Sequence, residues 1–351
     1  MALGRSSRQR TLRRAGALVA ALGVAAGAAC GGDDDEAASD AAGDGSSGEP
    51  VTIGYSAWPG WFPWAVTEEQ GIFEDAGVEV ELEYFSDYLT SLDAMSAGQL
   101  DGNTQTLNDT LVGVSAGSDQ VVVVVNDNSA GNDAIIVDQS INRIEDLAGK
   151  SIAAEPGVVD HFLLLQGLAT VGLTEEDIQF NGLPTDQAAA AFAGGEFDAV
   201  GVFAPFTVQA LERPGSKVLF DSADFPGTIP DFLVLDRAVV EERPEDVQKL
   251  VDAWYATLDW IEENPDEAIE IMAAKAEVSV EEYESFAGGT RIFSAEEALA
   301  SMTDDGETDL GPITEQVSAF LLDTGLMETE PDLEGLYDPS FTEDYVDRQG
   351  G

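Results

Sequence analysis

The sequence is poor in the residues that most metal sites and many catalytic sites require. Its 351 residues include one cysteine, one histidine and 15 lysines and arginines, against 68 aspartates and glutamates. One cysteine excludes a disulfide framework. A zinc site of Cys and His ligands is nearly excluded because it needs three or four of them. The net charge of −53 disfavours nucleic-acid binding, since phosphates repel an acidic surface. We therefore expect no metal, no cofactor and no nucleic-acid partner.

The apolar stretch near the N-terminus is short. Residues 15–29 are small and apolar, but these 15 residues fall short of the about 20 that a membrane-spanning helix needs. Five arginines and no acidic residue precede the stretch, an order typical of a secretory signal. We predict a signal peptide over residues 1–29, with a membrane anchor helix as the alternative. Subtracting those five positive charges from −53 leaves −58 for the remainder.

The only cysteine, Cys30, directly follows this stretch. The arrangement resembles a bacterial lipoprotein signal, in which the cysteine becomes lipidated, although Gly27 stands where that pattern prefers leucine. An ordinary cleaved signal with an incidental cysteine is the alternative. Residues 31–50 contain no large apolar side chain and cannot bury enough surface to fold. We predict that residues 30–50 are a lipidated cysteine and a flexible acidic tether, which hold an exported protein on the outer face of the cell membrane.

Strand and helix patterns alternate from Val51 onward. Short β-branched or alternating runs predict strands, and between them apolar residues recur at helical spacing. The clearest strand predictions are 51–55, 78–84, 120–125, 134–137, 151–154, 197–203, 217–221 and 232–235. After these the chain turns helical, beginning with an apolar stripe over 244–263. The pattern predicts an α/β fold with mainly parallel sheets flanked by helices, two lobes and a helical C-terminal third.

Six segments, in order, carry a resemblance over about residues 51–290. They are Ile53–Trp61, Glu69–Val78, Ala97–Asp101, Ile144–Ala153, Ala193–Ala199 and Trp254–Ala268. Together they resemble substrate-binding proteins of ABC importers in the nitrate, sulfonate, taurine, bicarbonate and thiamine-precursor superfamily. The resemblance implies a type II periplasmic-binding-protein clamp, which captures a small molecule and delivers it to a membrane permease. It also implies a monomer that is not an enzyme.

In such a clamp the chain passes twice between the lobes. Here the crossovers are expected near 128–133 and 222–231, where Gly, Asp, Asn and Pro are frequent. Lobe 1 would then comprise 51–130 plus 230–351, and lobe 2 would comprise 131–229. Closure of the two lobes would create the shape that the permease recognises.

Aromatic residues are expected to form part of the ligand site. Trp58 and Trp61 lie in the loop after the first strand, where the resemblance places the ligand. Trp64 lies inside the following helix, and core packing is the better interpretation there. Phe203 and Phe206 flank a turn that follows a strand, so either ring could wall the pocket.

The polar candidates all lie at strand ends, helix starts or crossovers. Each has a structural alternative, such as capping a helix for Asn108 and Asp109, a hinge role for the crossover pair, or a structural histidine. The polar candidates are Asn108, Asp109, Asn132, Asp133, Glu155, Asp160 and His161.

The candidate loops contain no lysine or arginine, whereas Glu155 and Asp160 would repel an anion. We therefore predict a cationic or neutral nitrogenous ligand held by carboxylates and aromatic faces. The alternative is an anion such as a sulfonate, nitrate or taurine, held by backbone amides. A thiamine-precursor-related enzyme is a second alternative, disfavoured by the export signal, and a surface adhesion or scaffolding protein is a third.

Overall fold

The computed structural model describes residues 48–303 and 309–350, which belong to one compact unit, Gly45–Gly351. The predicted signal peptide, Cys30 and most of the predicted tether lie outside the described residues. Over the two described ranges, no helix has the length and apolar character needed to cross a membrane.

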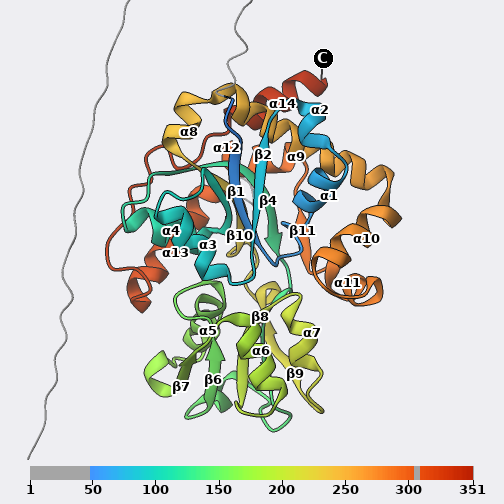
Figure 1. Ribbon diagram of the computed structural model, residues 1–351. Helices are drawn as coiled ribbons and strands as arrows, with labels where there is room; N and C mark the ends of the chain where they lie inside the picture. Colours follow the sequence, from blue (N-terminus) through green and yellow to red (C-terminus); the bar gives the residue numbers. More distant parts are fainter. Residues whose placement is uncertain (1–47, 304–308, 351) are drawn as a thin grey trace, which may run out of the picture. The chain divides into compact units, whose positions relative to one another are not determined.

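One sheet has six strands in the order β11-β4-β10-β3-β1-β2 (Figure 1). Its strands are β1 (Val51–Ser56), β2 (Val80–Phe85), β3 (Gly102–Thr106), β4 (Gln120–Ser129), β10 (Pro230–Asp236) and β11 (Thr290–Ile292). The run Val121–Val125 lies in the first part of β4, and every side chain in the run is buried. Such a run suits a strand that is covered on both faces.

The second sheet has five strands in the order β7-β6-β8-β5-β9 and lies below the first in Figure 1. Its strands are β5 (Asp133–Val137), β6 (Ser151–Ala154), β7 (Gln179–Gly182), β8 (Ala199–Phe203) and β9 (Lys217–Asp221). All of its strands come from one continuous stretch of chain. The α/β class with two sheets flanked by helices is thereby confirmed.

Strand pairing is mixed, where mainly parallel sheets were expected. β1 runs parallel to β2 and β3, and β6 runs parallel to β7 and β8. β10 is antiparallel to β3 and β4, β5 is antiparallel to β8 and β9, and β11 is antiparallel to β4. The antiparallel pairs form because β4, β5, β9 and β10 flank the two crossings between the sheets, so the strands that enter or leave run against their neighbours.

Helices cover both sheets. They are α1 (Pro63–Glu69), α2 (Ile72–Ala76), α3 (Tyr88–Ser96), α4 (Leu107–Ser115), α5 (Val159–Thr170), α6 (Thr185–Ala193), α7 (Phe206–Leu211), α8 (Arg237–Glu242), α9 (Pro244–Glu263), α10 (Pro265–Lys275), α11 (Val280–Ala287), α12 (Ala295–Thr303), α13 (Leu310–Thr324) and α14 (Ser340–Gly350). Short 3-10 helices span Ile144–Leu147, Glu175–Asp177 and Ser222–Asp224. The C-terminal region is therefore helical as predicted, apart from the short strand β11.

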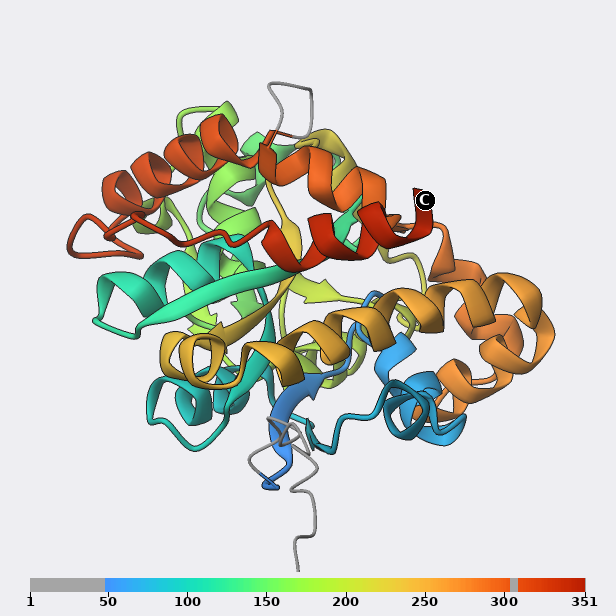
Figure 2. The same cartoon turned by 90° about the horizontal axis from the view of Figure 1, so that it is seen from above.

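The C-terminal region packs back over the six-stranded sheet (Figure 2). α14 lies beside α9, where the rings of Tyr255 and Tyr345 are 4.8 Å apart. α13 contacts α4 and also reaches the five-stranded side, because Phe320 meets Phe162 of α5 edge to face at 5.6 Å. One element of the C-terminal region thus contacts helices that flank both sheets.

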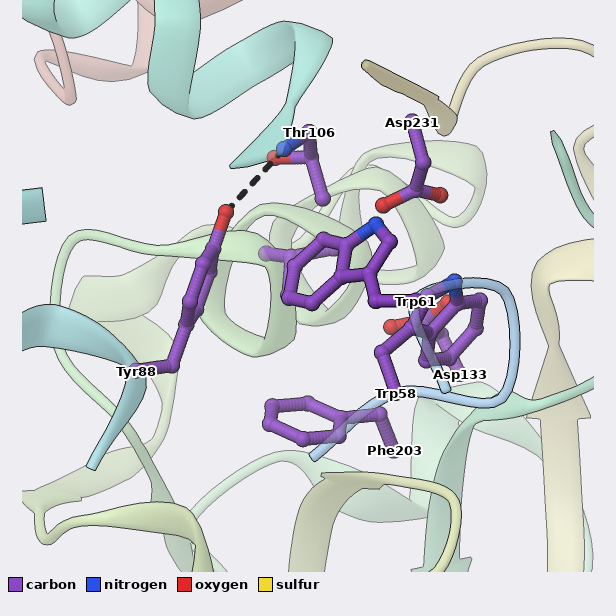
Figure 3. Close-up of a pocket in the computed structure, with 8 residues that line it drawn as sticks. Trp58, Trp61, Tyr88, Thr106, Asp133, Phe203 and Asp231 are labelled. Carbon is purple, nitrogen blue, oxygen red and sulfur yellow. Dashed lines mark hydrogen bonds between the residues drawn. The ribbon is translucent and has the colours of Figure 1, made fainter. Parts of the chain in front are cut away.

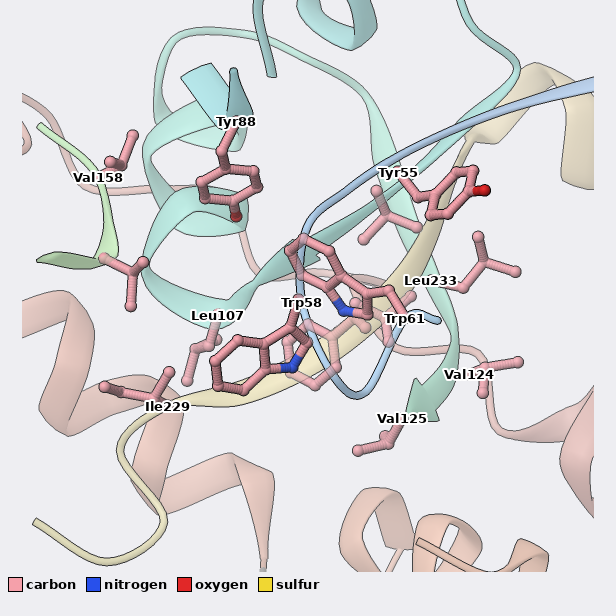
Figure 4. Close-up of a cluster of buried hydrophobic side chains, with 14 of the residues drawn as sticks. Tyr55, Trp58, Trp61, Tyr88, Leu107, Val124, Val125, Val158, Ile229 and Leu233 are labelled. Carbon is pink, nitrogen blue, oxygen red and sulfur yellow. The ribbon is translucent and has the colours of Figure 1, made fainter. Parts of the chain in front are cut away.

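The main hydrophobic core contains the loop after β1 as well as the sheets (Figure 4). Trp64 is fully buried, and its ring lies 4.7 Å from Trp254 and 5.9 Å from Phe73. The core interpretation of Trp64 is confirmed. Burial of such large aromatic surfaces fixes α1 against α9 and holds the preceding loop in place.

Candidate ligand-binding site

A small cavity lies between elements of the two sheets (Figure 3). The six-stranded side contributes five of its lining residues, and the five-stranded side contributes three. The lining residues are Trp58, Trp61, Tyr88, Thr106 and Asp231 from the first side, and Asp133, Val159 and Phe203 from the second. The free volume is about 10 Å³, room for one water-sized group.

Aromatic rings from both sides meet around the cavity. Phe203, at the end of β8, faces Trp58 edge-on at 6.3 Å and Tyr88 edge-on at 6.3 Å. Trp61 and Tyr88 lie 5.4 Å apart. Since such contacts favour tilted and edge-to-face geometry, the rings pack the two sides against each other.

The loop that carries Trp58 and Trp61 is held in place by the carboxyl group of Asp127. Trp58 Nε1 donates a hydrogen bond to Asp127 Oδ1 at 3.0 Å. Gly60 lies directly against the same carboxylate, and a Cβ at this position would overlap it. The loop therefore needs a glycine for close approach and an acceptor on β4 to orient the indole.

Asp109 lies behind the cavity rather than in its lining. It accepts hydrogen bonds from Tyr88 Oη at 2.9 Å and from Thr106 Oγ1 at 2.7 Å. Asn108 donates to its other oxygen at 2.8 Å. Burial raises the pKa of Asp109 to about 7. Thr106, rather than Asn108 or Asp109, caps α4, which corrects the capping alternative, since the chain is still extended at Thr106 and its hydroxyl accepts from the Asp109 amide.

Three buried aspartates meet on the other side of the cavity. Asp127 and Asp231 are direct cross-strand partners on β4 and β10, and Asp133 begins β5. Among the described residues, no N–H or hydroxyl donor reaches Asp127 Oδ2, Asp133 Oδ2 or either carboxyl oxygen of Asp231, whereas the carboxyls of Asp127 and Asp231 hydrogen-bond to each other. Burial raises the pKa of Asp127 to about 8 and that of Asp133 to about 7. Burial, together with the charges of Asp127 and Asp133, raises the pKa of Asp231 well above its ordinary value.

Glu155 and Asp160 share a hydroxyl outside the cavity lining. Thr185 Oγ1 lies 2.7 Å from Glu155 Oε2 and 2.9 Å from Asp160 Oδ2. Burial raises the pKa of both carboxyls, and it raises that of Asp160 strongly. Asp160 Oδ1 has no hydrogen-bond partner in the described part of the chain. Glu155 and Asp160 thus belong to the group of buried carboxyls around the site, but neither lines the cavity.

His161, Asn132 and Phe206 also lie outside the lining. Gly157 donates its amide to His161 Nδ1 at 3.2 Å, and His161 Nε2 lies 2.7 Å from Glu175. Burial lowers the pKa of His161. Asn132 donates to the Phe286 carbonyl and to Thr290, as expected of a residue that fixes the crossover, and Phe206 packs on Phe203 at 5.5 Å. A ligand contact for these three residues stays a prediction.

Four lining residues were absent from the sequence-based candidates: Tyr88, Thr106, Val159 and Asp231. Tyr88 and Val159 are the first residues of α3 and α5, and Thr106 ends β3. Ligands of α/β sheets bind beyond the carboxyl ends of the strands, where the next helices begin, and all three residues lie at such junctions. The sequence points less clearly to Asp231. This residue lies at the end of the second predicted crossover, but in the structure it belongs to β10.

Hydrogen-bond donors at the cavity are few and uncharged. Of the residues that the structure describes, no lysine or arginine lines it. Trp61 Nε1 is buried and has no partner within residues 48–303 and 309–350. Val159 opens the 12-residue helix α5, whose N-cap residue Val158 offers no side-chain cap, so the first-turn amides have no acceptor from a capping side chain.

Several relatives match between half and three quarters of the chain. A protein of Brucella abortus (strain 2308) named as a binding protein is 27% identical over 74% of this chain and 82% of its own length. The aliphatic sulfonates-binding protein of Bacillus subtilis (strain 168) is 24% identical over 67% and 72%. The taurine-binding periplasmic protein of Escherichia coli (strain K12) is 29% identical over 50% and 55%.

Solved structures share the fold. The alkanesulfonate-binding protein from Xanthomonas axonopodis pv. citri, bound to MOPS, aligns with a TM-score of 0.70 over 82% of this chain and 98% of its own, at 19% identity. A desulfurization enzyme aligns with a TM-score of 0.61 over 85% and 99%, at 17% identity. The sequence pattern of the NMT1-like family matches residues 44–276. The two-sheet α/β fold and this match agree, and the chain belongs to the NMT1-like family.

Proposed function

We propose that this protein is the substrate-binding component of an ABC importer, which captures a small solute between two lobes and delivers it to a membrane permease. The observation that carries the proposal is the cavity to which both sheets contribute side chains. A site made from both sides is completed only when the sides approach, so ligand binding and closure are linked. The relatives named as binding proteins support the same function.

The lobes of this proposal are residues 51–130 plus 230–351 and residues 131–229. Each contains one of the two sheets. The permease would recognise the closed pair. A binding protein of an importer works outside the cell membrane, so export suits this role, and one relative is named as a periplasmic protein. A lipid on Cys30 would hold the protein at the outer face of that membrane.

For the solute, the relatives favour the anion alternative over the cationic or neutral nitrogenous compound that the sequence predicted. They carry the names of sulfonate- and taurine-binding proteins, and these names do not support the predicted cationic ligand. The prediction relied on the missing lysines and arginines. An anion can instead be held by uncharged donors, here Trp61 Nε1 and the first-turn amides of α5.

A thermal-shift panel tests the function. The purified protein is melted with taurine, propane-1-sulfonate, nitrate, guanidinium and ethylamine. A ligand at 100 times its Kd stabilises the native state by about 2.7 kcal/mol, so a sulfonate is expected to raise the Tm by several degrees. A rise with the organic cations alone would overturn the anion proposal. Failure of the protein to retain any small molecule, in the panel or by mass spectrometry after purification, would overturn the binding function.

Catalysis needs a separate measurement, because a desulfurization enzyme shares the fold. Any sulfonate that raises the Tm is incubated with the protein and then quantified. A binding protein returns it unchanged. Release of sulfite or sulfate would replace the transport proposal with an enzymatic one.

A further inference from the structure

Asp127 and Asp231 form a carboxyl pair where the chain crosses between the two sheets. They are direct partners on β4 and β10, and their side chains are buried, at 0% and 1% exposure. β4 leads into the first crossing and β10 follows the second, so the pair lies beside both. Their carboxyls hydrogen-bond to each other. Since a carboxylate can only accept, this hydrogen bond requires a proton on one of the two.

The other contacts of the pair indicate which carboxyl carries the proton. Asp127 Oδ1 accepts a hydrogen bond from Trp58 Nε1 at 3.0 Å, which favours the charged form of Asp127. No N–H or hydroxyl group of the described residues donates to Asp231. Asp231 is therefore the donor and Asp127 the acceptor. One proton thus connects a residue that lines the cavity to the indole of the tryptophan loop.

The surroundings of the pair offer no positive charge that could replace the proton. The charges of Asp133 and Asp109 act on the pair, and the pair acts in turn on the phenols of Tyr88 and Tyr283. Within the described ranges, no lysine or arginine lines the cavity. Two ionised carboxylates in contact would repel each other strongly at the low dielectric constant of a buried site. Loss of the proton is therefore unfavourable while the pair stays buried.

Burial of the pair depends on the packing of the two sides. Asp231 lines the cavity from the six-stranded side, and Asp133 and Phe203 line it from the five-stranded side (Figure 3). Asp133 is 1% exposed, and its Oδ2 has no partner in the part of the chain that the structure describes. Burial raises the pKa of Asp231. Separation of the sides would bring water to both carboxyls and reverse this effect.

We propose that Asp127 and Asp231 form a pH-sensitive switch, which shares one proton while the two sides are packed together and releases it to solvent when the sides separate. Closure on a solute then takes up a proton. This coupling rests on the proposed function, because it needs a solute that closes the sides, whereas the shared proton does not. The packed form binds the proton more tightly, so solute affinity falls as the pH rises, by up to about tenfold per pH unit.

Infrared spectroscopy of the ligand-free protein at pH 6.5 tests the shared proton. A protonated carboxyl has a C=O stretching band that a carboxylate lacks. In Asp231→Asn and in Asp127→Asn an amide N–H can replace the shared proton as the donor, so each variant should lose one protonated carboxyl. Asp93→Asn is the matched control, because Asp93 is exposed on α3, and it should lose a carboxylate instead. Loss of a carboxylate alone in all three variants would overturn the proposal.

Isothermal titration calorimetry at pH 6.5 tests the coupling. Propane-1-sulfonate is the probe, because it has no group that titrates near this pH. Titrations in phosphate and in imidazole, whose ionisation enthalpies differ, give the number of protons taken up per solute bound. We expect Asp127→Asn to take up fewer protons than the unaltered protein and Asp93→Asn, by up to about one. Asp127 suits this comparison because it does not line the cavity.

Each outcome separates the switch from the binding function. Equal proton uptake by Asp127→Asn and the unaltered protein would overturn the coupling. If propane-1-sulfonate does not bind, the titration uses the member of the thermal-shift panel that raises the Tm. If none binds, the binding function fails and the coupling fails with it, while the infrared spectra still decide the shared proton. Melting curves check that each variant is folded, and Asp231→Asn replaces Asp127→Asn if the latter is not.

Discussion

Asp133 is the first residue of β5, and burial raises its pKa from an ordinary 3.8 to about 7. Between these two values the native state holds a proton that the unfolded chain has lost. Stability therefore falls as the pH rises from about 4 to about 7, and the contribution is lost above pH 7. Asp109 has a raised pKa of about 7 as well and acts in the same direction.

We expect the ligand-free protein to melt at a higher temperature at pH 5 than at pH 8. One such group accounts for roughly 2–3 kcal/mol over this interval. In Asp133→Asn the pH dependence should be smaller, since asparagine does not titrate. Calorimetric melts at both pH values measure the change. An unchanged slope in the variant would show that Asp133 is already ionised at pH 5 in the folded protein.

Gly60 allows the tryptophan loop to lie against Asp127. A Cβ there would overlap the carboxylate. Gly60→Ala should therefore lower the free energy of unfolding by about 1–3 kcal/mol and weaken ligand binding by displacing Trp58. Gly288→Ala is the control, because nothing lies within 4 Å of an added Cβ at Gly288, and its effect should stay within about 0.5 kcal/mol. Equal stabilities of the two variants in urea titrations would contradict the close approach.

Four of the lining residues could be predicted from the sequence, because they sit where strands end or crossovers begin. These are Trp58, Trp61, Asp133 and Phe203. Asp231 could not, because its role depends on β10 lying beside β4, a pairing of residues about 100 positions apart. Asp109 lies behind the cavity because it accepts a hydrogen bond from Tyr88, and the spacing of residues along the sequence does not reveal this contact.

At the scale of elements, α13 is one of the links between the C-terminal region and the five-stranded side. Phe320 of α13 packs edge to face against the fully buried Phe162 of α5. Phe320→Ala should destabilise the closed arrangement by about 1–3 kcal/mol, from the lost ring contact and buried area. We expect weaker solute binding with a faster dissociation rate in stopped-flow fluorescence. Leu211→Ala, which truncates an exposed leucine on α7, should leave that rate unchanged.

The elements themselves were largely predictable, because their signals are local. The valine run of β4 and the apolar stripe of α9 need only neighbouring residues for their interpretation. The direction of pairing is not local. It depends on the two crossings between the sheets, and for this reason the expectation of mainly parallel sheets did not hold for β5 and β10.

For the whole molecule, the small cavity has a direct consequence. A free volume of about 10 Å³ is too small for a solute of seven heavy atoms such as taurine. If the protein binds such a solute as proposed, we expect the two sides to separate to admit it. Small-angle X-ray scattering should show a radius of gyration for the ligand-free protein that decreases when a binding solute is added. The same radius with and without a solute that raises the Tm would contradict closure by the lobes.

The strand order also determines when each sheet can form during synthesis. All five strands of the second sheet lie between Asp133 and Asp221, so that sheet can assemble as soon as this stretch has emerged. The six-stranded sheet cannot form until later, because β10 lies between β3 and β4 in the sheet and begins only at Pro230. Until then β3 and β4 have exposed edges and a valine-rich surface that favours aggregation. A nascent chain that ends before β10 should therefore depend on chaperones, although its five-stranded sheet is complete.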